Sequence, residues 1–285
     1  MNDRLWLWVV KGLPKRALSR LFGKVACQGW TRHFIPLYIK RYKIDTSELS
    51  KDIAEYAHLT DFFARQLKAQ SRQVAPGEDR VTSPVDGTVT GFGKIDGHRL
   101  IQAKGRDYTL EELFRGAEEK AAAFLDGQFL TLYLSPADYH RVHAPVSGRV
   151  TEMVYQPGTL FPVNGRGIRL VERLFVNNER VTTFLSTHFG EVAIVKVGAM
   201  NVGSVKVAYD ENVQTNRKRK KGKKRTYEPP VAVRKGEEIG WFEFGSTVIL
   251  LFPRHTVTFL PDLKPGSSVR MGETIGRVLN CEGGI

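Results

Sequence analysis

Residues 241–252 read Trp-Phe-Glu-Phe-Gly-Ser-Thr-Val-Ile-Leu-Leu-Phe, an apolar run rich in aromatic and β-branched side chains. Such a run is typical of a strand buried inside a sheet. Around it, from Ala75-Pro-Gly77 onward, apolar and polar residues alternate and Gly and Pro recur at short intervals, as in a β-sandwich or barrel. The pattern predicts strands at 87–95, 129–134, 148–155, 181–186, 191–207, 241–252 and 256–260.

The N-terminal quarter of the chain has a helical period instead, with expected breaks near Pro36 and at Thr46-Ser47. We therefore predict an α+β protein. N-terminal amphipathic helices form a membrane-associating region over residues 1–69, and a β-rich, barrel- or sandwich-like catalytic domain follows over residues 70–285. Within that domain, Thr109-Leu-Glu-Glu112 is a capping box and predicts one short structural helix.

The net charge of +13 is concentrated in two segments. Residues 1–43 hold ten Lys or Arg against Asp3 alone, and residues 217–225 hold eight more, so the remainder of the chain is slightly acidic. This distribution argues against a protein that coats nucleic acid, and we expect no nucleic-acid partner. The tract 216–224 is predicted to be an exposed loop, which is either simply solvated or in contact with anionic lipid.

The first basic segment also carries an apolar face. Its apolar residues, which alternate with Lys and Arg, are Leu5, Trp6, Trp8, Val9, Val10, Leu18, Leu21, Phe22 and Val25. This pattern is typical of a helix that lies in a membrane interface, but a helical hairpin packed on its own domain produces it too. No apolar run reaches the roughly 18 residues that span a bilayer. Cys27 and Cys281 form neither a disulfide framework nor a metal motif, which suits a reducing compartment.

The pair Gly245-Ser246 is the first candidate for chemistry. Glycine leaves the carbonyl group of residue 245 sterically open, and the Ser246 hydroxyl can attack that carbonyl through a five-membered ring. A serine hydroxyl is a weak nucleophile until a base takes its proton. Gly-Ser also occurs at 203–204 and 266–267, and most such pairs are turns or strand kinks. Self-cleavage at 245–246 therefore requires a base from elsewhere in the chain.

The densest polar cluster, residues 135–145, reads Ser-Pro-Ala-Asp-Tyr-His-Arg-Val-His-Ala-Pro and directly follows a predicted strand. Histidine exchanges its proton near neutral pH, so His140 or His143 can supply the base for Ser246. A metal site is less well supported, because His-x-x-His lacks the helical i, i+4 spacing and has no third ligand nearby; we expect no metal. Two structural histidines bonded to backbone are the alternative.

An aspartate completes the constellation. Ser83-Pro-Val-Asp-Gly-Thr88 fixes Asp86 between a proline and a glycine at the entry to a predicted strand. Alone, Asp-Gly predicts only a turn. Together with Ser246, it permits a Ser-His-Asp arrangement in which Asp86 orients His143.

Several of these motifs resemble phosphatidylserine decarboxylase proenzymes. The longer ones are Val85-Asp-Gly87, Gln102-Ala-Lys-Gly105, Tyr133–Pro145 and Phe244-Gly-Ser-Thr247, and shorter ones lie in the same order at 62–65, 157–164, 178–181 and 197–204. At the cleavage motif, Phe244 stands where the family usually has leucine. The tract 217–225 is also more basic than the resemblance would suggest.

The resemblance implies a processing reaction. His143, oriented by Asp86, deprotonates Ser246, whose oxygen attacks the Gly245 carbonyl. Elimination and hydrolysis leave a pyruvoyl group, a covalent cofactor derived from Ser246. The large chain would be 1–245 and the small chain 246–285, held together by the sheet.

It also implies a function. The pyruvoyl ketone would form a Schiff base with phosphatidylserine in an anionic membrane, and carbon dioxide would leave. His140, assisted by His143, would then return a proton to give phosphatidylethanolamine. The resemblance further implies a homodimer. The expected location is peripheral, on the cytoplasmic face of a bacterial inner membrane.

Two other functions fit the same residues. Ser246, His143 and Asp86 could form the stable triad of a serine hydrolase in an uncleaved chain, although the Gly-x-Ser-x-Gly elbow is missing and the serine is expected mid-strand. The other is a non-enzymatic module that binds anionic lipid through its basic segments.

Overall fold

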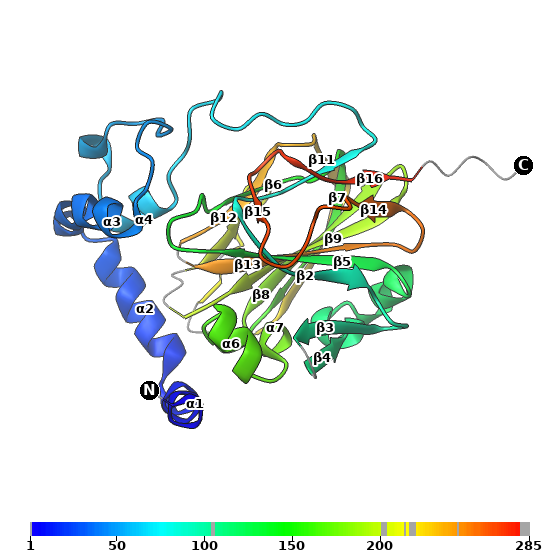
Figure 1. Ribbon diagram of the computed structural model, residues 1–285, viewed down its shortest axis with the longest axis horizontal. Helices are drawn as coiled ribbons and strands as arrows, with labels where there is room; N and C mark the ends of the chain where they lie inside the picture. The colour runs from blue at the N-terminus through cyan, green and yellow to red at the C-terminus, as the bar shows by residue number, and fades with distance from the viewer. Residues whose placement is uncertain are drawn as a thin grey trace, which may run out of the picture.

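A computed structural model shows a helical N-terminal part beside a sheet-rich body (Figure 1). It describes residues 2–103, 106–200, 204–213, 215–216, 221–243 and 245–279. The N-terminal helices are α1 (Asp3–Gly12), α2 (Lys15–Ala26), α3 (Ile35–Tyr42) and α4 (Leu59–Phe63), with 3-10 turns at Gly29–Phe34 and Ile53–Glu55.

Local sequence explains where these helices begin. The Asn2 side chain accepts a hydrogen bond of 2.8 Å from the Arg4 amide and caps α1. Pro36 lies in the first turn of α3, where its missing N–H leaves no bond unmade. The break predicted near Pro36 is the boundary between the 3-10 turn that ends at Phe34 and α3, which this proline helps to start. α3 ends at Tyr42, shortly before the break expected at Thr46-Ser47.

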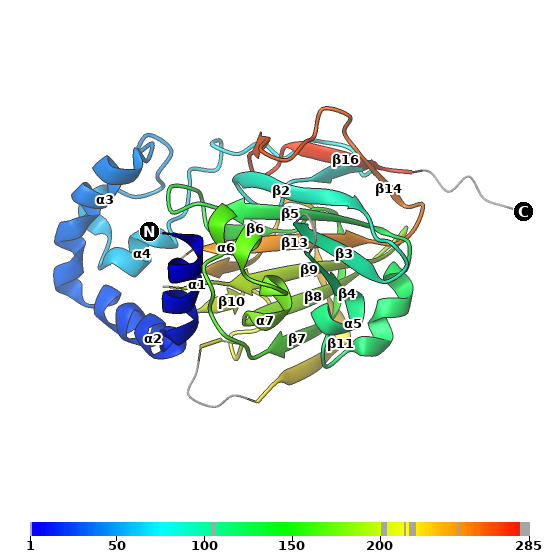
Figure 2. The same ribbon diagram turned by 60° about the horizontal axis from the view of Figure 1, so that its bottom comes forward.

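The body is built on one antiparallel sheet of eight strands (Figure 2). Its order is β11 (Lys223–Val233), β7 (Gly148–Gln156), β8 (Arg180–Thr187), β9 (Gly190–Gly198), β13 (Ser246–Phe252), β5 (Gln128–Leu134), β2 (Gly87–Lys94) and β15 (Ser268–Val269). β13 thus lies in the interior of the sheet, with β9 on one side and β5 on the other.

Smaller sheets and short helices complete the body. One sheet joins β1 (Arg80–Thr82), β16 (Thr274–Val278) and β14 (Val257–Phe259), another joins β10 (Val205–Val207), β12 (Glu238–Phe242) and β6 (Arg141–His143), and β3 (Arg99–Ala103) pairs with β4 (Arg106–Thr109). The helices are α5 (Leu110–Leu113), α6 (Gly165–Leu170) and α7 (Leu174–Asn177), with a 3-10 turn at Glu118–Phe124.

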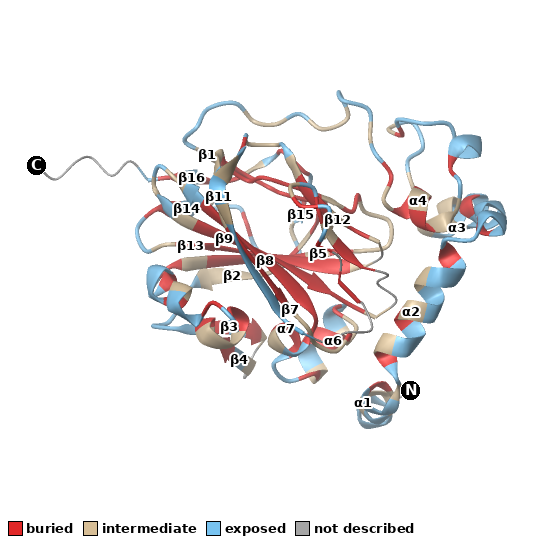
Figure 3. Cartoon of the chain, turned by 180° about the vertical axis from the view of Figure 1, so that it is seen from behind, coloured by how far each residue is buried: buried red, intermediate tan, exposed pale blue. Residues whose placement is uncertain are grey.

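β13 joins the two faces of the core. Val248 and Leu250 belong to one hydrophobic cluster, whereas Ile249 and Leu251 belong to a second cluster on the opposite face. All seven residues of the strand are buried, as its continuous apolar sequence predicts. Figure 3 shows this buried centre and, in contrast, the largely exposed surfaces of α1, α2 and α3.

The structure confirms the predicted fold class, with N-terminal helices before a sheet-rich, sandwich-like body. The capping box at Thr109–Glu112 is also confirmed, since both of its hydrogen bonds are formed at the start of α5. Strand positions near 87–95, 129–134 and 148–155 agree to within one residue with β2, β5 and β7. The division into domains at residue 69 stays a prediction.

Two predicted strands are each divided in the structure. The span 191–207 contains β9 and β10, and the span 241–252 contains the end of β12 and all of β13. The second division arises because β12 pairs with β10 and β6 in one sheet, whereas β13 pairs with β9 and β5 in another. Ser246 therefore begins a strand, and the mid-strand position expected for it is wrong.

The prediction of an exposed loop at 216–224 is wrong for its last two residues. Lys223 and Lys224 pair with Tyr155 and Val154 of β7 and begin the edge strand β11. An edge strand tolerates exposed charge, and it also tolerates the prolines of its later part, so it lacks the apolar alternation that reveals inner strands. Residues 217–220 of the tract lie outside the described part of the chain.

Candidate active site

Ser246 occupies an unusual environment at the start of β13. It lies opposite Gly198 of β9 and Leu134 of β5, and its side chain is fully buried. Its Oγ has no hydrogen-bond partner among the described residues, and neither has the buried Oγ1 of Thr247. An unpaired buried hydroxyl costs about 1–3 kcal/mol, so its retention indicates a role other than stability.

Backbone pairing brings the two histidines to the same end of the sheet as Ser246. Leu134, which is paired with Ser246, is the last residue of β5, and the histidine loop starts directly after it. The loop is fastened to the end of β12, because the Phe242 amide donates to the His140 carbonyl at 3.0 Å. His143 lies on β6 opposite Glu238. The segment that leads to Gly245 is thus bonded to the histidine loop at Phe242, three residues before the glycine.

His140 is completely buried, and its ring packs against that of Phe63 with a centroid distance of 4.0 Å. Its Nδ1 lies 2.8 Å from the Asp138 carbonyl, to which it must donate, so Nε2 carries the lone pair. That Nε2 is a buried atom with no hydrogen-bond partner in the described structure. Burial, helped by the positive charge of Arg65, lowers the pKa of His140 to about 3.

The proton-donor role predicted for His140 stays a prediction, and the geometry adds a condition to it. In the uncleaved chain Nε2 is an acceptor. His140 can therefore donate a proton only after Nε2 has first received one.

His143 is also held as a neutral imidazole. Its Nδ1 donates to the Gly236 carbonyl at 2.8 Å, and its Nε2 accepts from the Tyr139 hydroxyl at 3.0 Å. Burial lowers the pKa of His143. Both histidines do bond backbone carbonyls, as the structural alternative expected, but each does so through Nδ1 and keeps Nε2 as a base.

Asp86 does not contact His143 in the way expected from the sequence. Its carboxylate accepts from Arg72 Nε at 2.9 Å and from the Met271 amide at 2.8 Å. The Asp86 loop is nevertheless beside His143, because the His143 amide donates to the Pro84 carbonyl at 2.8 Å. In the uncleaved chain a guanidinium, the stronger partner, holds the Asp86 carboxylate, and the role of Asp86 in orienting His143 stays a prediction.

Sequence reasoning did not assign roles to the residues that hold the histidine loop. Arg65 Nη2 donates to the carbonyls of Ala137 at 2.7 Å and Asp138 at 2.9 Å, and the Tyr38 hydroxyl donates to the carbonyl of Pro136 at 2.8 Å. These contacts fasten the N-terminal region to the loop. The motif Phe62-Phe-x-Arg65 was the available signal for Arg65, whereas Tyr38 had none.

The described residues contain no cluster of three or more His, Cys, Asp or Glu side chains suited to a metal ion. Cys27, the cysteine within the described ranges, is exposed and lies in the N-terminal part of the chain. What these side chains offer is an unpaired hydroxyl and two neutral imidazoles. That set suits acyl transfer from a neighbouring carbonyl and proton transfer.

Comparison with known proteins gives a consistent result. The family model for phosphatidylserine decarboxylase matches residues 59–277. A phosphatidylserine decarboxylase proenzyme of Brevibacillus brevis is 45% identical over 276 residues, covering 96% of this chain and 98% of its own length. The proenzyme of Anaeromyxobacter sp. is 45% identical over 97% of this chain and 99% of its own. That of Coxiella burnetii is 40% identical over 94% and 96%, respectively.

Fold, site and these similarities together define a decarboxylase, an enzyme of the carboxy-lyase class. The chain belongs to the phosphatidylserine decarboxylase family. Its relatives bear the name proenzyme, so the family is one of precursors.

Proposed function

We propose that this chain cleaves itself between Gly245 and Ser246 and then decarboxylates phosphatidylserine to phosphatidylethanolamine. The observation that carries the proposal is the buried, unpartnered Oγ of Ser246, one residue after a glycine whose Cα has open space around it. Of the other two Gly-Ser pairs, Ser204 Oγ donates to Glu243 and Ser267 Oγ accepts from the Lys264 amide. Ser246 is the serine of the three with no such bond in the described structure.

In the processing step, His143 Nε2 takes the Oγ proton of Ser246 after the Tyr139 hydroxyl has turned away. The bond from Oγ to the Gly245 carbonyl carbon forms, the bond from that carbon to nitrogen breaks, and the proton passes to the nitrogen. The resulting ester then loses the Cα proton of residue 246 and the Gly245 carboxylate by elimination, which forms a Cα–Cβ double bond. One water then hydrolyses the product and releases ammonia, leaving a pyruvoyl group at the start of the small chain.

The pyruvoyl carbonyl would supply the electron-withdrawing group needed for loss of carbon dioxide from an attached amino acid. The surroundings of Ser246 fit such a group, because Leu134 and Gly198 lie opposite it and the apolar run 248–252 follows on its strand. His140 and His143 keep neutral imidazoles at this end of the sheet. In our proposal His140 Nε2 holds the proton that is returned to the substrate.

The N-terminal helices support a peripheral membrane location for this activity. Among the described residues, nine of the thirteen exposed large hydrophobic side chains lie between residues 5 and 37. They are Leu5, Trp8, Leu18, Leu21, Phe22, Val25, Trp30, Phe34 and Leu37. No helix in the described ranges has the length and apolar character needed to cross a bilayer. We propose that these residues and their basic neighbours bind the surface of an anionic membrane.

Intact mass under denaturing conditions tests the processing step. The purified protein should give two species, residues 1–245 and a chain from residue 246 to 285 whose mass shows loss of ammonia. Ser246→Ala should give a single species near 32.1 kDa, whereas the matched control Ser267→Ala should cleave normally. Carbon dioxide release from phosphatidylserine should follow cleavage across this series.

A different result would support the rival enzyme. A wild-type chain that stays intact near 32.1 kDa, remains active and reacts with a serine-directed phosphonate would identify a serine hydrolase and overturn the proposal.

A further inference from the structure

A cavity of about 450 Å³ separates α2 from the segment that leads to the cleavage site. In Figures 1 and 2, α2 stands beside the end of the sheet where β12 ends and β13 begins. The residues that line the cavity include Arg20, Gly23, Lys24, Cys27, Gln28 and Glu243. Glu243 is two residues before Gly245 in the sequence.

One face of α2 lines this cavity, and the opposite face is exposed to solvent. Arg20, Gly23, Lys24 and Cys27 line the cavity at the i, i+3, i+4, i+7 spacing of one face. Leu18, Leu21, Phe22 and Val25 have the same spacing on the opposite face and are exposed. If the apolar face lies on a membrane, the basic face is directed to a cavity that is also lined by Glu243, three residues before Ser246.

The electrostatics of the cavity favour an anion. Arg20 and Lys24 lie one helical turn apart and have no ion-pair partner within the described ranges. α2 itself contains no acidic residue. The one carboxylate of the lining, Glu243, is already bonded to Lys206 Nζ at 2.8 Å and to Ser204 Oγ at 2.7 Å. Within the described part of the lining, Arg20 and Lys24 therefore face the cavity without an acidic partner of their own.

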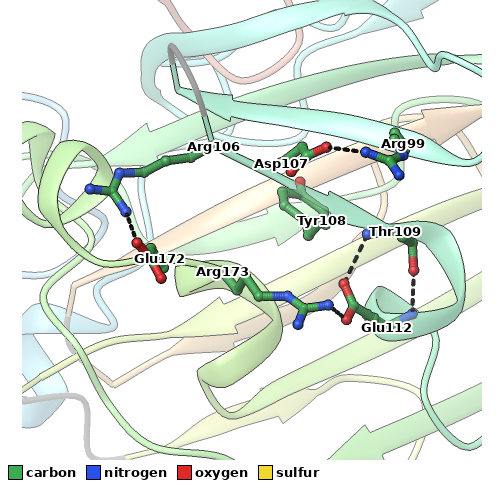
Figure 4. A pocket seen from close by; sticks show the side chains of 8 residues that line it. All are labelled: Arg99, Arg106, Asp107, Tyr108, Thr109, Glu112, Glu172 and Arg173. Atoms are coloured by element: carbon green, nitrogen blue, oxygen red, sulfur yellow. Dashed lines mark hydrogen bonds and ion pairs between the residues drawn. The ribbon is translucent and has the colours of Figure 1, made fainter.

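A second cavity that contains arginines, of about 360 Å³, shows the opposite arrangement (Figure 4). Its arginines are paired within the cavity itself: Arg99 with Asp107 at 3.1 Å, Arg106 with Glu172 at 3.2 Å, and Arg173 with Glu112. These charges are already neutralised by the protein. Arginines alone therefore do not make a cavity cationic. In the described structure the cavity at α2 is cationic because Arg20 and Lys24 lack the acidic partners that the other arginines have.

We propose that the cavity beneath α2 binds the phosphodiester of the phospholipid substrate, with Arg20 and Lys24 as its cationic ligands. This inference rests on the proposed function, since it assigns part of the substrate to that site. Guanidinium and ammonium groups bind phosphate oxygens by charge-assisted hydrogen bonds. α2 is held in place for this role by Arg16, whose Nη1 donates to the Gly158 carbonyl at 2.9 Å.

Cys27 provides a direct probe, because it lines the cavity and is exposed. The test uses the Ser246→Ala chain, so that binding is measured without cleavage or turnover. Alkylation of the Cys27 peptide is followed by mass spectrometry with glycerophosphoserine, inorganic phosphate or serine present. Glycerophosphoserine and, more weakly, phosphate should slow alkylation at least severalfold, and serine should not.

Variants show which charges are responsible. Arg20→Gln and Lys24→Gln should each remove most of the protection, whereas the control Lys40→Gln on α3 should retain it. Equal protection in all variants, or protection by serine as strong as by glycerophosphoserine, would overturn the proposal. Protection by phosphate but not by glycerophosphoserine would assign the cavity to free phosphate and also overturn it.

Processed enzyme supplies the kinetic test. With monomeric short-chain phosphatidylserine, Arg20→Gln should raise KM about tenfold and change kcat little, with cleavage unaffected by mass. A KM effect seen only with vesicles would show membrane docking and contradict a headgroup site. If no chain decarboxylates phosphatidylserine, the proposed function fails, while the alkylation result still decides whether the cavity binds the anion.

Discussion

At the scale of single residues, two of the candidate catalytic side chains carry unpaired buried atoms. Ser246 Oγ and His140 Nε2 are both buried without a hydrogen-bond partner in the described structure. Burying polar atoms unpaired costs stability, and proteins retain such costs chiefly at functional sites. His140 adds a second sign, because burial and Arg65 lower its pKa to about 3.

The lowered pKa predicts how stability changes with pH. In the unfolded chain a histidine has a pKa near 6.5, so between about pH 6.5 and pH 3 the unfolded chain binds a proton that folded His140 does not. The contribution of His140 to the free energy of unfolding is therefore fully present above about pH 6.5, and it decreases as the pH falls. When the pH is lowered from 7 to 5, the His140 proton balance should lower the free energy of unfolding by roughly 2 kcal/mol.

Urea unfolding of the uncleaved Ser246→Ala chain measures this effect. The His140→Gln variant in that background should lose roughly 2 kcal/mol less unfolding free energy between pH 7 and pH 5 than the chain with His140. The control His33→Gln changes an exposed histidine and should keep the original pH dependence. Equal pH slopes with and without His140 would contradict the prediction.

At the scale of elements, the N-terminal helices have two kinds of contact. Outward, α1, α2 and α3 expose apolar side chains, of which Trp8 is 76% and Leu21 61% exposed. Inward, Tyr38 and Arg65 bond carbonyls of the histidine loop. Deleting residues 1–43 would remove both kinds of contact, because Tyr38 lies within that range. Substitutions on the outward face therefore test membrane binding more selectively.

Trp8→Ser combined with Leu21→Ser should weaken binding to anionic vesicles by tenfold or more, because two large apolar side chains no longer enter the interface. Self-cleavage should continue, since both side chains point to solvent. Vesicle sedimentation and intact mass measure the two outcomes. Ile101→Ser, which changes a 63% exposed residue of β3, is the matched control and should bind normally. Undiminished binding of the double variant would exclude these helices as the membrane surface.

At the scale of the whole molecule, the position of β13 determines what cleavage can do. The proposed small chain begins with this strand, which is paired with β9 and β5 along its length. Its later strands also pair with the large chain, β16 with β1 and β15 with β2. The proposed cleavage at the end of the sheet would therefore break one covalent bond and leave the strand ladders in place.

The two chains should consequently remain together under native conditions. On gel filtration at micromolar concentration, the processed protein should elute as one species at the position of the uncleaved Ser246→Ala chain. Separation should require denaturant and coincide with loss of the β-sheet circular dichroism signal. Release of the small chain by dialysis, with the remaining signal intact, would contradict the arrangement.

The features that could be predicted from sequence are those carried by neighbouring residues. The apolar continuity of 248–252 predicts a strand buried on both faces, and Thr109–Glu112 predicts a helix start, because these patterns depend on local geometry. Short strands such as β1, β6 and β15 were not predicted, since two or three residues carry no periodicity. β11 was missed because an exposed edge strand needs no apolar alternation.

By itself, the sequence determined the α+β class, the family and the identity of the candidate residues, because strand period and motif order are written along the chain. Only the tertiary structure decided that Asp86 is bound by Arg72, that each histidine keeps Nε2 as a base, and that Arg20 and Lys24 face a cavity beside Glu243. Those facts depend on segments that are distant in sequence and adjacent in the fold, where burial and pairing set both charge and hydrogen bonding.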